Sequence, residues 1–436
     1  MANDRPIESY IWQIIKAGLS FTAVILYSQV LGAAGRGILS IYLLYVQVFL
    51  MMNELFVGSA LANWISKFGL RRFIPRIALV SGIMLCLVGL LGAYFNAIGG
   101  EKSSTEPNTR FSLMLGLLMV WSLVLIVQNV AMNFFQSRGD IIEKNKWLVG
   151  FEGLKVGGLL ILIFTISQSV VHIEQIMMAL VLGGILWVIF CVFRLFSLRA
   201  FSMQKKSENE SIGHTWNEGI WAQIGQITLF FIYRIPLFVA ARWMGDAAAG
   251  ILANALLVID TIWIYANTMG TIVHGRALQF ANQEKQEKIT LRFTAFSFWG
   301  TLLLLGAVVI VPNSLFTWVF GAEFFPMKSL VIQAIPGIMA LAVFAPFGNL
   351  FHARNQFKLL LWNHAMGLGV MSLILSGFFL GIESFQFTQL IWAWNIALVT
   401  VMFAHIYRGK FTKKRNLSFA LNTLLIYRLI RKWGRL

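Results

Sequence analysis

The sequence predicts an all-α polytopic membrane protein, with twelve transmembrane helices arranged as two parallel six-helix repeats around a central cavity. Three observations predict this fold class: the composition is strongly apolar, apolar runs of membrane-spanning length recur from end to end, and one short motif occurs twice. Of the 436 residues, 58% are hydrophobic and 12% are charged, whereas soluble globular chains carry about 25% charged residues. This composition leaves no room for a sizeable soluble domain.

The apolar runs set the number of predicted spans. A helix that rises 1.5 Å per residue needs about 20 apolar residues to cross a hydrocarbon core of about 30 Å. A cleavable signal peptide is not expected, because Asp4 and Glu8 precede the first run with only Arg5 to balance them. We predict twelve spans, at about 11–31, 38–63, 74–98, 111–135, 147–171, 176–199, 219–242, 250–275, 289–311, 327–352, 357–380 and 386–407.

The distribution of Lys and Arg predicts the orientation, since these residues stay cytoplasmic in short loops. If the N-terminus is inside, the inner loops hold 17 Lys and Arg, the outer loops hold 5, and nine more follow Tyr407. We therefore expect both termini in the cytoplasm. The same distribution explains the net charge of +17, because basic loops face anionic lipid. No nucleic-acid partner is expected, as no recognition module accompanies the basic residues.

Two short motifs predict the internal repeat. LGAAGRGILS at 31–40 and MGDAAAGILA at 244–253 share five of ten residues at an offset of 213, and NFFQSR at 133–138 and NLFHAR at 349–354 share three of six at an offset of 216. The glycines of the first motif permit a tight external turn between spans. Six spans are an even number, so both halves enter the membrane from the same side and form a parallel repeat.

The repeat also predicts the division of the chain. We expect an N-terminal six-helix lobe over residues 1–205 and a C-terminal six-helix lobe over 206–410. Residues 411–436 follow as a basic amphipathic tail, whose Arg, Lys, Leu, Ile and Trp residues favour a helix lying on the inner leaflet.

Polar residues in the second helix of each lobe are candidates for a cavity wall. Ser40, Gln47 and Glu54 recur every seven residues and so share one helical face. At the offset of 213, Gln47 corresponds to Asp260 and Glu54 to Asn267. A carboxylate inside a membrane span is costly and tends to face water or a partner. Glu54 and Asp260 are expected to face one another and to bind and release a proton that couples transport to a gradient. The alternative is that each carboxylate is a structural partner of a nearby cation.

Span 7 supplies the cation for such a cavity. Gln223, Gln226 and Arg234 lie on one helical face, and Arg234 is roughly 22 Å from the cytoplasmic end of the span at 1.5 Å per residue. A guanidinium group matches phosphate oxygens bidentately, so Arg234 favours an anionic substrate. The alternative is a salt bridge from Arg234 to Glu54 or Asp260.

Two further cations complete the candidate substrate-binding residues. Arg242 lies near the outer end of span 7, and Lys16 lies in span 1 on the face of Ser20 and Tyr27. For Lys16 the alternative is that its side chain extends to the inner membrane surface.

Other polar residues predict no catalytic chemistry. Glu152 and Lys155 are expected to form a local pair at i, i+3, and Cys86 and Cys191 are expected to be packing residues. The histidines have no metal-ligand spacing, and no phosphate loop or nucleophile elbow is present. We predict no enzyme activity, no catalytic residue, no metal and no cofactor, with coupling to a proton or sodium gradient left open.

Three stretches resemble polysaccharide flippases of the Wzx type, which export O-antigen and other lipid-linked oligosaccharides. These flippases belong to the multidrug/oligosaccharidyl-lipid/polysaccharide exporter superfamily, with the multidrug and toxic-compound extrusion proteins and the lipid II flippase. LGAAGRGILSIYLLYVQVFLMMNELFVGSALANWI is similar to their helix 1 to 2 region, MGDAAAGILANALLVIDTIWIYANTMGTIV to their helix 7 to 8 region, and VFGAEFFPMKSLVIQAIPGIMALAVFAPFGNLFHARNQFK to their segment around helices 9 to 11.

The resemblance implies a function. It implies that the chain flips an undecaprenyl-pyrophosphate-linked oligosaccharide to the periplasmic leaflet of a bacterial inner membrane by alternating access, in polysaccharide or lipopolysaccharide biosynthesis. Its expected partners are the lipid bilayer, the lipid-linked glycan and the polymerases or ligases of glycan assembly. Cavity cations hold the pyrophosphate in this family, and Arg234 and Lys16 match that role, whereas Glu54 departs from it. The alternative is an ion-coupled small-molecule exporter, of the multidrug extrusion type or a major facilitator permease.

Overall fold

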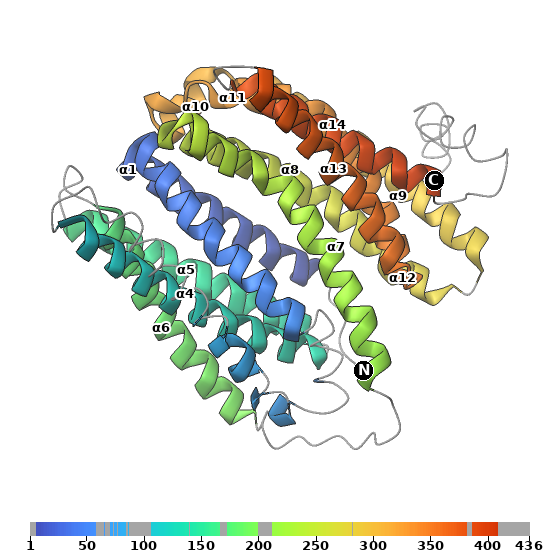
Figure 1. Ribbon diagram of the computed structural model, residues 1–436. Helices are drawn as coiled ribbons and strands as arrows, with labels where there is room; N and C mark the ends of the chain where they lie inside the picture. Colours follow the sequence, from blue (N-terminus) through green and yellow to red (C-terminus); the bar gives the residue numbers. More distant parts are fainter. Residues whose placement is uncertain are drawn as a thin grey trace. The chain divides into compact units, whose positions relative to one another are not determined.

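The described part of the chain is helical throughout (Figure 1). It forms two compact units, Met1–Gln223 (unit 1) and Ile224–Leu436 (unit 2). The computed structural model describes residues 6–57, 65, 70–72, 74–75, 77–83, 86, 106–138, 140–165, 172–198, 212–280, 282–381 and 386–408.

Unit 1 is built from long helices around an aromatic core. Helix α1 packs against α4 and α5, and α6 packs against the same two helices. The ring centroid of Trp187 lies 4.9 Å from that of Trp147 and 6.0 Å from that of Phe151. The Phe151 ring in turn stacks on Trp121, with a centroid distance of 5.8 Å. The elements are α1 (Pro6–Val57), the 3-10 turn η1 (Leu70–Arg72), α4 (Glu106–Ser137), α5 (Ile141–Thr165), α6 (Ile173–Ser197) and the first turns of α7 (Ile212–Val239).

Unit 2 is organised around α12, most of whose side chains are buried. Helices α8, α9 and α14 pack against α12, and α13 packs against α14. After the remainder of α7, its elements are the π-helical turn η4 (Ala240–Met244), α8 (Asp246–Gln279), α9 (Gln283–Ile310), α10 (Asn313–Phe320), the 3-10 turn η5 (Ala322–Phe324), α11 (Met327–Gln333), α12 (Ile335–Ala353), α13 (Phe357–Gly381) and α14 (Phe387–Arg408).

Ten helices in the described residues are long and apolar enough to cross a membrane. Helix α1 accounts for two predicted spans, because two helical segments join in it at Gly32. The other nine helices correspond to the predicted spans 4 to 12. The span predicted at 74–98 lies largely outside the described residues, as do the boundary at 205/206 and the tail at 411–436.

The glycines of the first repeated motif adopt the same unusual backbone conformation. Gly32 has φ 64° and ψ −174°, and Gly245 has φ 92° and ψ 172°. This region of conformational space is essentially restricted to glycine. The prediction of an external loop between the first two spans of each half is therefore wrong in detail, because a single glycine separates the helical segments there. Arg36, which lies between the first two predicted spans, is instead buried in α1 and donates to Ser40 Oγ at 2.7 Å.

The second repeated motif ends a helix in both units. Helix α4 ends at Ser137 and α12 at Ala353, each one residue before the aligned arginine. The aligned Asn133 and Asn349 both donate from Nδ2 to the backbone oxygen four residues earlier, at 2.9 Å in each case. Shared side-chain roles at aligned positions are the structural counterpart of the sequence repeat.

Candidate functional site

The clearest candidate site in unit 2 is an ion pair between α7 and α8. Arg234 Nη2 donates to Asp260 Oδ2 at 3.1 Å, and the two side chains are 22% and 37% exposed. Pro236 lies two residues beyond Arg234 within α7, where proline removes a backbone donor and loosens the helix. The contact is one N–H···O bond and not a bidentate fork, so the guanidinium group keeps donors for another anion.

Arg234 thus forms one of the two salt bridges that the sequence left open. Tyr233, the preceding residue, packs between aromatic rings of α8 and α14, with its ring centroid 6.1 Å from Trp263 and 6.3 Å from Trp394. These rings fix the position of α7 next to the pair. Rigid packing beside a partly exposed cation is an arrangement suited to holding an anion.

The candidate site in unit 1 centres on Glu54, near the end of α1. Asn129 Nδ2 donates to Glu54 Oε1 at 2.6 Å, and Gln223 Nε2 donates to Glu54 Oε2 at 3.1 Å. Asn133 Nδ2 in turn donates to Asn129 Oδ1 at 3.1 Å. Neutral amides therefore surround this carboxylate, in contrast to the guanidinium group at Asp260.

Gln226, one turn from Gln223 on α7, contacts a different group. Its amide nitrogen lies 3.2 Å from His352 Nε2 on α12, so the imidazole nitrogen is the acceptor. On the preceding residue, the Gly225 carbonyl accepts a hydrogen bond from His364 Nδ1 of α13 at 2.9 Å. These two contacts fasten the middle of α7 to α12 and α13.

The remaining candidates are not brought to either acid within their own units. Lys16 is partly exposed and contacts no acidic group among the described residues. Gln47 and Asn267 are exposed, and Arg242 lies exposed in η4 with its guanidinium carbon 5.9 Å from the Trp243 ring centroid. Ser40, from the same heptad face as Gln47, is buried, so that face is not uniform.

The expected local pair on α5 forms. Lys155 Nζ lies 2.6 Å from Glu152 Oε2 at the predicted i, i+3 spacing, and Glu152 is buried. Of the cysteines, both of which are free thiols, Cys191 is buried and Cys86 is exposed, so the packing role expected for both fits Cys191 alone. Among the described residues no three His, Cys, Asp or Glu side chains are grouped so as to hold a metal.

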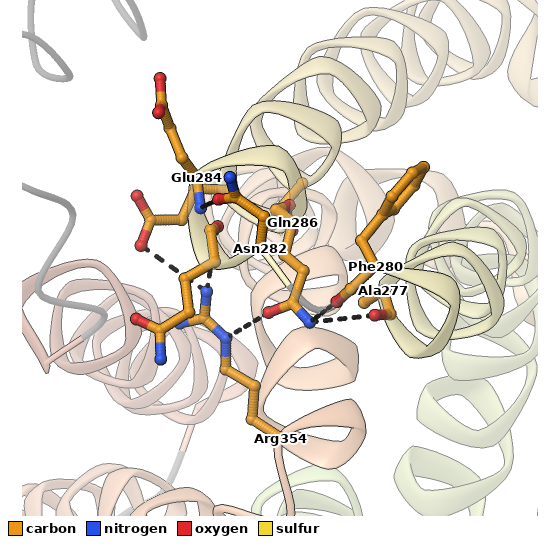
Figure 2. A network of polar contacts seen from close by, with 9 residues as sticks. Ala277, Phe280, Asn282, Glu284, Gln286 and Arg354 are labelled. Carbon is orange, nitrogen blue, oxygen red and sulfur yellow. Dashed lines mark hydrogen bonds and ion pairs between the residues drawn. The ribbon is translucent and has the colours of Figure 1, made fainter.

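Sequence reasoning missed a polar network at the α8–α9 connection (Figure 2). Arg354 Nε donates to Gln286 Oε1 at 2.9 Å, and Arg354 Nη2 lies 3.6 Å from Glu287 Oε1. Gln286 Nε2 donates to the backbone oxygens of Ala277 and Phe280 at the end of α8. Arg354 lies in the second repeated motif, and that position is the one signal that could have pointed to the network.

Sequence reasoning also missed the partners of Glu54. Asn129 and Asn133 lie four residues apart in an otherwise apolar span, so both occupy one helical face. Polar residues at that spacing inside a span are the signal that could have found them.

Comparison with known proteins places the fold. No protein-family model matches the sequence, and no curated protein matches it. The lipid II flippase MurJ, in an inward closed conformation, matches with a TM-score of 0.66 at 14% identity, over 98% of this chain and 92% of that chain. An inward-facing multidrug resistance MATE family transporter of the MOP superfamily matches with a TM-score of 0.57 at 17% identity, over 90% and 92%.

A MOP superfamily transporter from Pyrococcus furiosus, whose binding pocket is described as having reverse polarity, matches with a TM-score of 0.55 at 16% identity, over 92% of each chain. The chain has the fold of these transporters. The predicted all-α, twelve-helix, multi-pass membrane fold is thereby confirmed. The similar structures are those of transporters and flippases.

Proposed function

We propose that this chain is a flippase that moves an undecaprenyl-pyrophosphate-linked oligosaccharide from the cytoplasmic to the periplasmic leaflet of a bacterial inner membrane by alternating access. The glycan head crosses through the protein while the lipid tail stays in the bilayer. Two lines support the proposal. One is the sequence resemblance to Wzx-type flippases, and the other is the likeness of fold to a lipid II flippase over 98% of the chain.

The observation that carries the proposal is the position of Arg234. A guanidinium group lies within a membrane-spanning helix, partly exposed, and only one bond joins it to Asp260. Charged groups inside a membrane are costly and mark the path of a substrate or ion. A pyrophosphate offers several oxygen acceptors, which the planar fork of the remaining guanidinium donors can bind bidentately.

The test is flipping in proteoliposomes of a fluorescent polyprenyl-pyrophosphate-linked sugar, scored by its protection from a membrane-impermeant reductant. A hydrogen bond to a charged group contributes about 1.5–3 kcal/mol, so Arg234→Gln should slow flipping about ten- to hundredfold. Arg234→Lys should retain part of the rate, because it keeps the charge and loses the planar fork. The exposed Arg292, replaced by Gln, is the matched control and should flip at the wild-type rate.

A double variant separates anion binding from simple neutralisation of Asp260. If Arg234 binds the substrate, Arg234→Gln with Asp260→Asn stays as slow as Arg234→Gln alone. If Arg234 serves only to neutralise Asp260, the double variant recovers the wild-type rate, and the proposal fails.

Glu54 favours a second candidate function, an ion-coupled exporter of small molecules of the multidrug extrusion type. Its described partners are the neutral amides of Asn129 and Gln223, so its carboxylate can take up and release a proton without breaking an ion pair. Such a group couples transport to a gradient when its protonation alternates with the conformation of the protein.

This candidate predicts gradient-driven transport of a cationic dye in inverted vesicles. Glu54→Gln should abolish the dependence of the transport rate on pH, whereas Glu284→Gln, at an exposed site, should keep it. Flipping of the polyprenyl-pyrophosphate substrate with no dye transport by the wild type would reject this candidate.

A further inference from the structure

Helix α10 (Asn313–Phe320) lies in the connection between the membrane-spanning helices α9 and α12. It turns Phe316 and Phe320 inward, where both are buried, and the buried Phe324 follows in η5. It leaves Leu315 44% exposed and Trp318 78% exposed. Large apolar side chains therefore occupy both its inner face and an exposed flank.

The two exposed flanks of α10 differ in chemistry. At 100° per residue, Leu315 and Val319 lie on one side of the buried stripe, and Ser314 and Thr317 lie on the other. Trp318 lies opposite the stripe, between the two flanks. A helix with its inner face on the protein, one flank apolar and the opposite flank polar has the arrangement required at a boundary between hydrocarbon and water.

Exposed apolar side chains of α9 extend to the end of that helix, just before α10. Leu303 is 73% exposed, Val309 45% and Ile310 83%. In the sequence no charged residue occurs between Arg292 and Glu323. The chain thus runs from a membrane-spanning helix into α10 without a charged residue between them.

Other exposed aromatic residues lie toward the same face of the membrane. Consecutive spans alternate in direction, so α7, α9 and α13 end on one face of the membrane. At that face Trp243 of η4 is 53% exposed and packs on Phe379 of α13, with ring centroids 4.4 Å apart. Figure 1 draws α10 and α11 next to each other at one end of unit 2.

The opposite boundary is marked in the same way. Trp362, near the start of α13, is 63% exposed, and Tyr407, near the end of α14, is 86% exposed. Along α13, Trp362 and Phe379 are about 26 Å apart at 1.5 Å per residue, close to the hydrocarbon thickness of about 30 Å. Trp and Tyr are enriched at both membrane–water interfaces.

We propose that α10 is an interfacial helix, whose partner is the headgroup–acyl boundary of the bilayer at the face that the Lys and Arg distribution makes periplasmic. Leu315 inserts among the acyl chains just below the headgroups, the Trp318 indole lies at the headgroup boundary, and Ser314 faces water. The helix anchors the connection between α9 and α12 to the membrane surface.

The experiment measures the depth of nitroxide labels by electron paramagnetic resonance in nanodiscs of phosphatidylethanolamine and phosphatidylglycerol. Single cysteines replace Ser314, Leu315 or Trp318 in a Cys86→Ser, Cys191→Ala background. Leu303→Cys, on the exposed side of α9, is the deep control, and Lys285→Cys, exposed in the first turn of α9, is the aqueous control. Collisions with oxygen report lipid, and collisions with a water-soluble nickel complex report solvent.

Labels at 315 and 318 should report a depth between those of the two controls, and the label at 314 should match Lys285→Cys. Nickel accessibility at 315 and 318 equal to that of Lys285→Cys would place the helix in water and overturn the proposal. A label at 318 reached by neither reagent would overturn it as well, since Trp318 would then be covered by protein. Leu315→Cys keeps the test decisive if Trp318→Cys does not fold.

Discussion

The aligned arginines Arg138 and Arg354 show how one residue of the repeat has acquired two different environments. Arg138 Nε lies 3.2 Å from Asp140, and the two side chains are 33% and 46% exposed. Arg354 and Glu287 are 13% and 9% exposed, and Gln286 shares the guanidinium group. Exposed ion pairs contribute about 0–1 kcal/mol to stability. When one member of a buried pair is removed, the other is left buried without a hydrogen-bond partner, and the protein is destabilised by more.

Arg354→Gln should therefore lower the free energy of unfolding by about 1–3 kcal/mol, because Glu287 loses its cation and Gln286 loses a donor. Arg138→Gln, the matched change in the other half, should lower it by less than about 1 kcal/mol. The measurement is the thermal unfolding midpoint of each variant in detergent. Equal shifts for the two variants would show that the network of Figure 2 adds no stability.

At the residue scale, the sequence predicts which side chains are unusual better than it predicts their partners. The cost of a charge in a membrane marks Arg234, Asp260 and Glu54 from position alone. The pairing of Arg234 with Asp260 was one of two alternatives, because it depends on how α7 and α8 cross. The amide partners of Glu54 were missed, since Asn129 lies 75 residues away in the sequence and its position follows from tertiary packing.

At the scale of elements, bilayer thickness makes the long helices predictable. Each must hold about 20 apolar residues, and α4, α6 and α9 coincide with runs of that kind. Helix α10 escaped prediction because it has eight residues and does not span. Its apolar and polar residues share about two turns, too short a stretch for helical periodicity to be recognised.

The glycine breaks can be tested because their effect is confined to the backbone. At Gly245 an added Cβ would meet no atom within 4 Å, so any cost of Gly245→Ala comes from its φ of 92°. We expect Gly245→Ala and Gly32→Ala to lower the free energy of unfolding by about 1–3 kcal/mol each. Thermal unfolding in detergent measures the effect.

Gly18→Ala and Gly275→Ala are the controls for these variants. Both glycines lie in helices with open space around the Cβ position, where alanine is favoured over glycine by about 0.5–1 kcal/mol. Destabilisation by the control changes as large as that by Gly245→Ala would contradict a special backbone role for the repeated glycine.

At the scale of the whole molecule, the repeat, the spans and the charge distribution constrain one another. The two motif pairs require six spans per half, an even number, so both halves start on the same side of the membrane. The predicted inner loops hold 17 basic residues and the predicted outer loops hold 5, which predicts that this side is cytoplasmic. One span too many or too few would reverse the orientation of every later helix. The labelling of two exposed positions on opposite sides of one helix therefore tests the predicted topology.

Asp246 and Lys285 form such a pair, because both are exposed and α8 alone separates them. In a Cys86→Ser, Cys191→Ala background, Asp246→Cys should react with a membrane-impermeant maleimide added to intact spheroplasts, whereas Lys285→Cys should react only after permeabilisation. Reaction of both from outside would show that α8 does not cross the membrane. Reaction of Lys285→Cys alone from outside would keep the crossing and reverse the orientation, since Lys and Arg would then lie on the translocated side against the rule that predicts cytoplasmic termini.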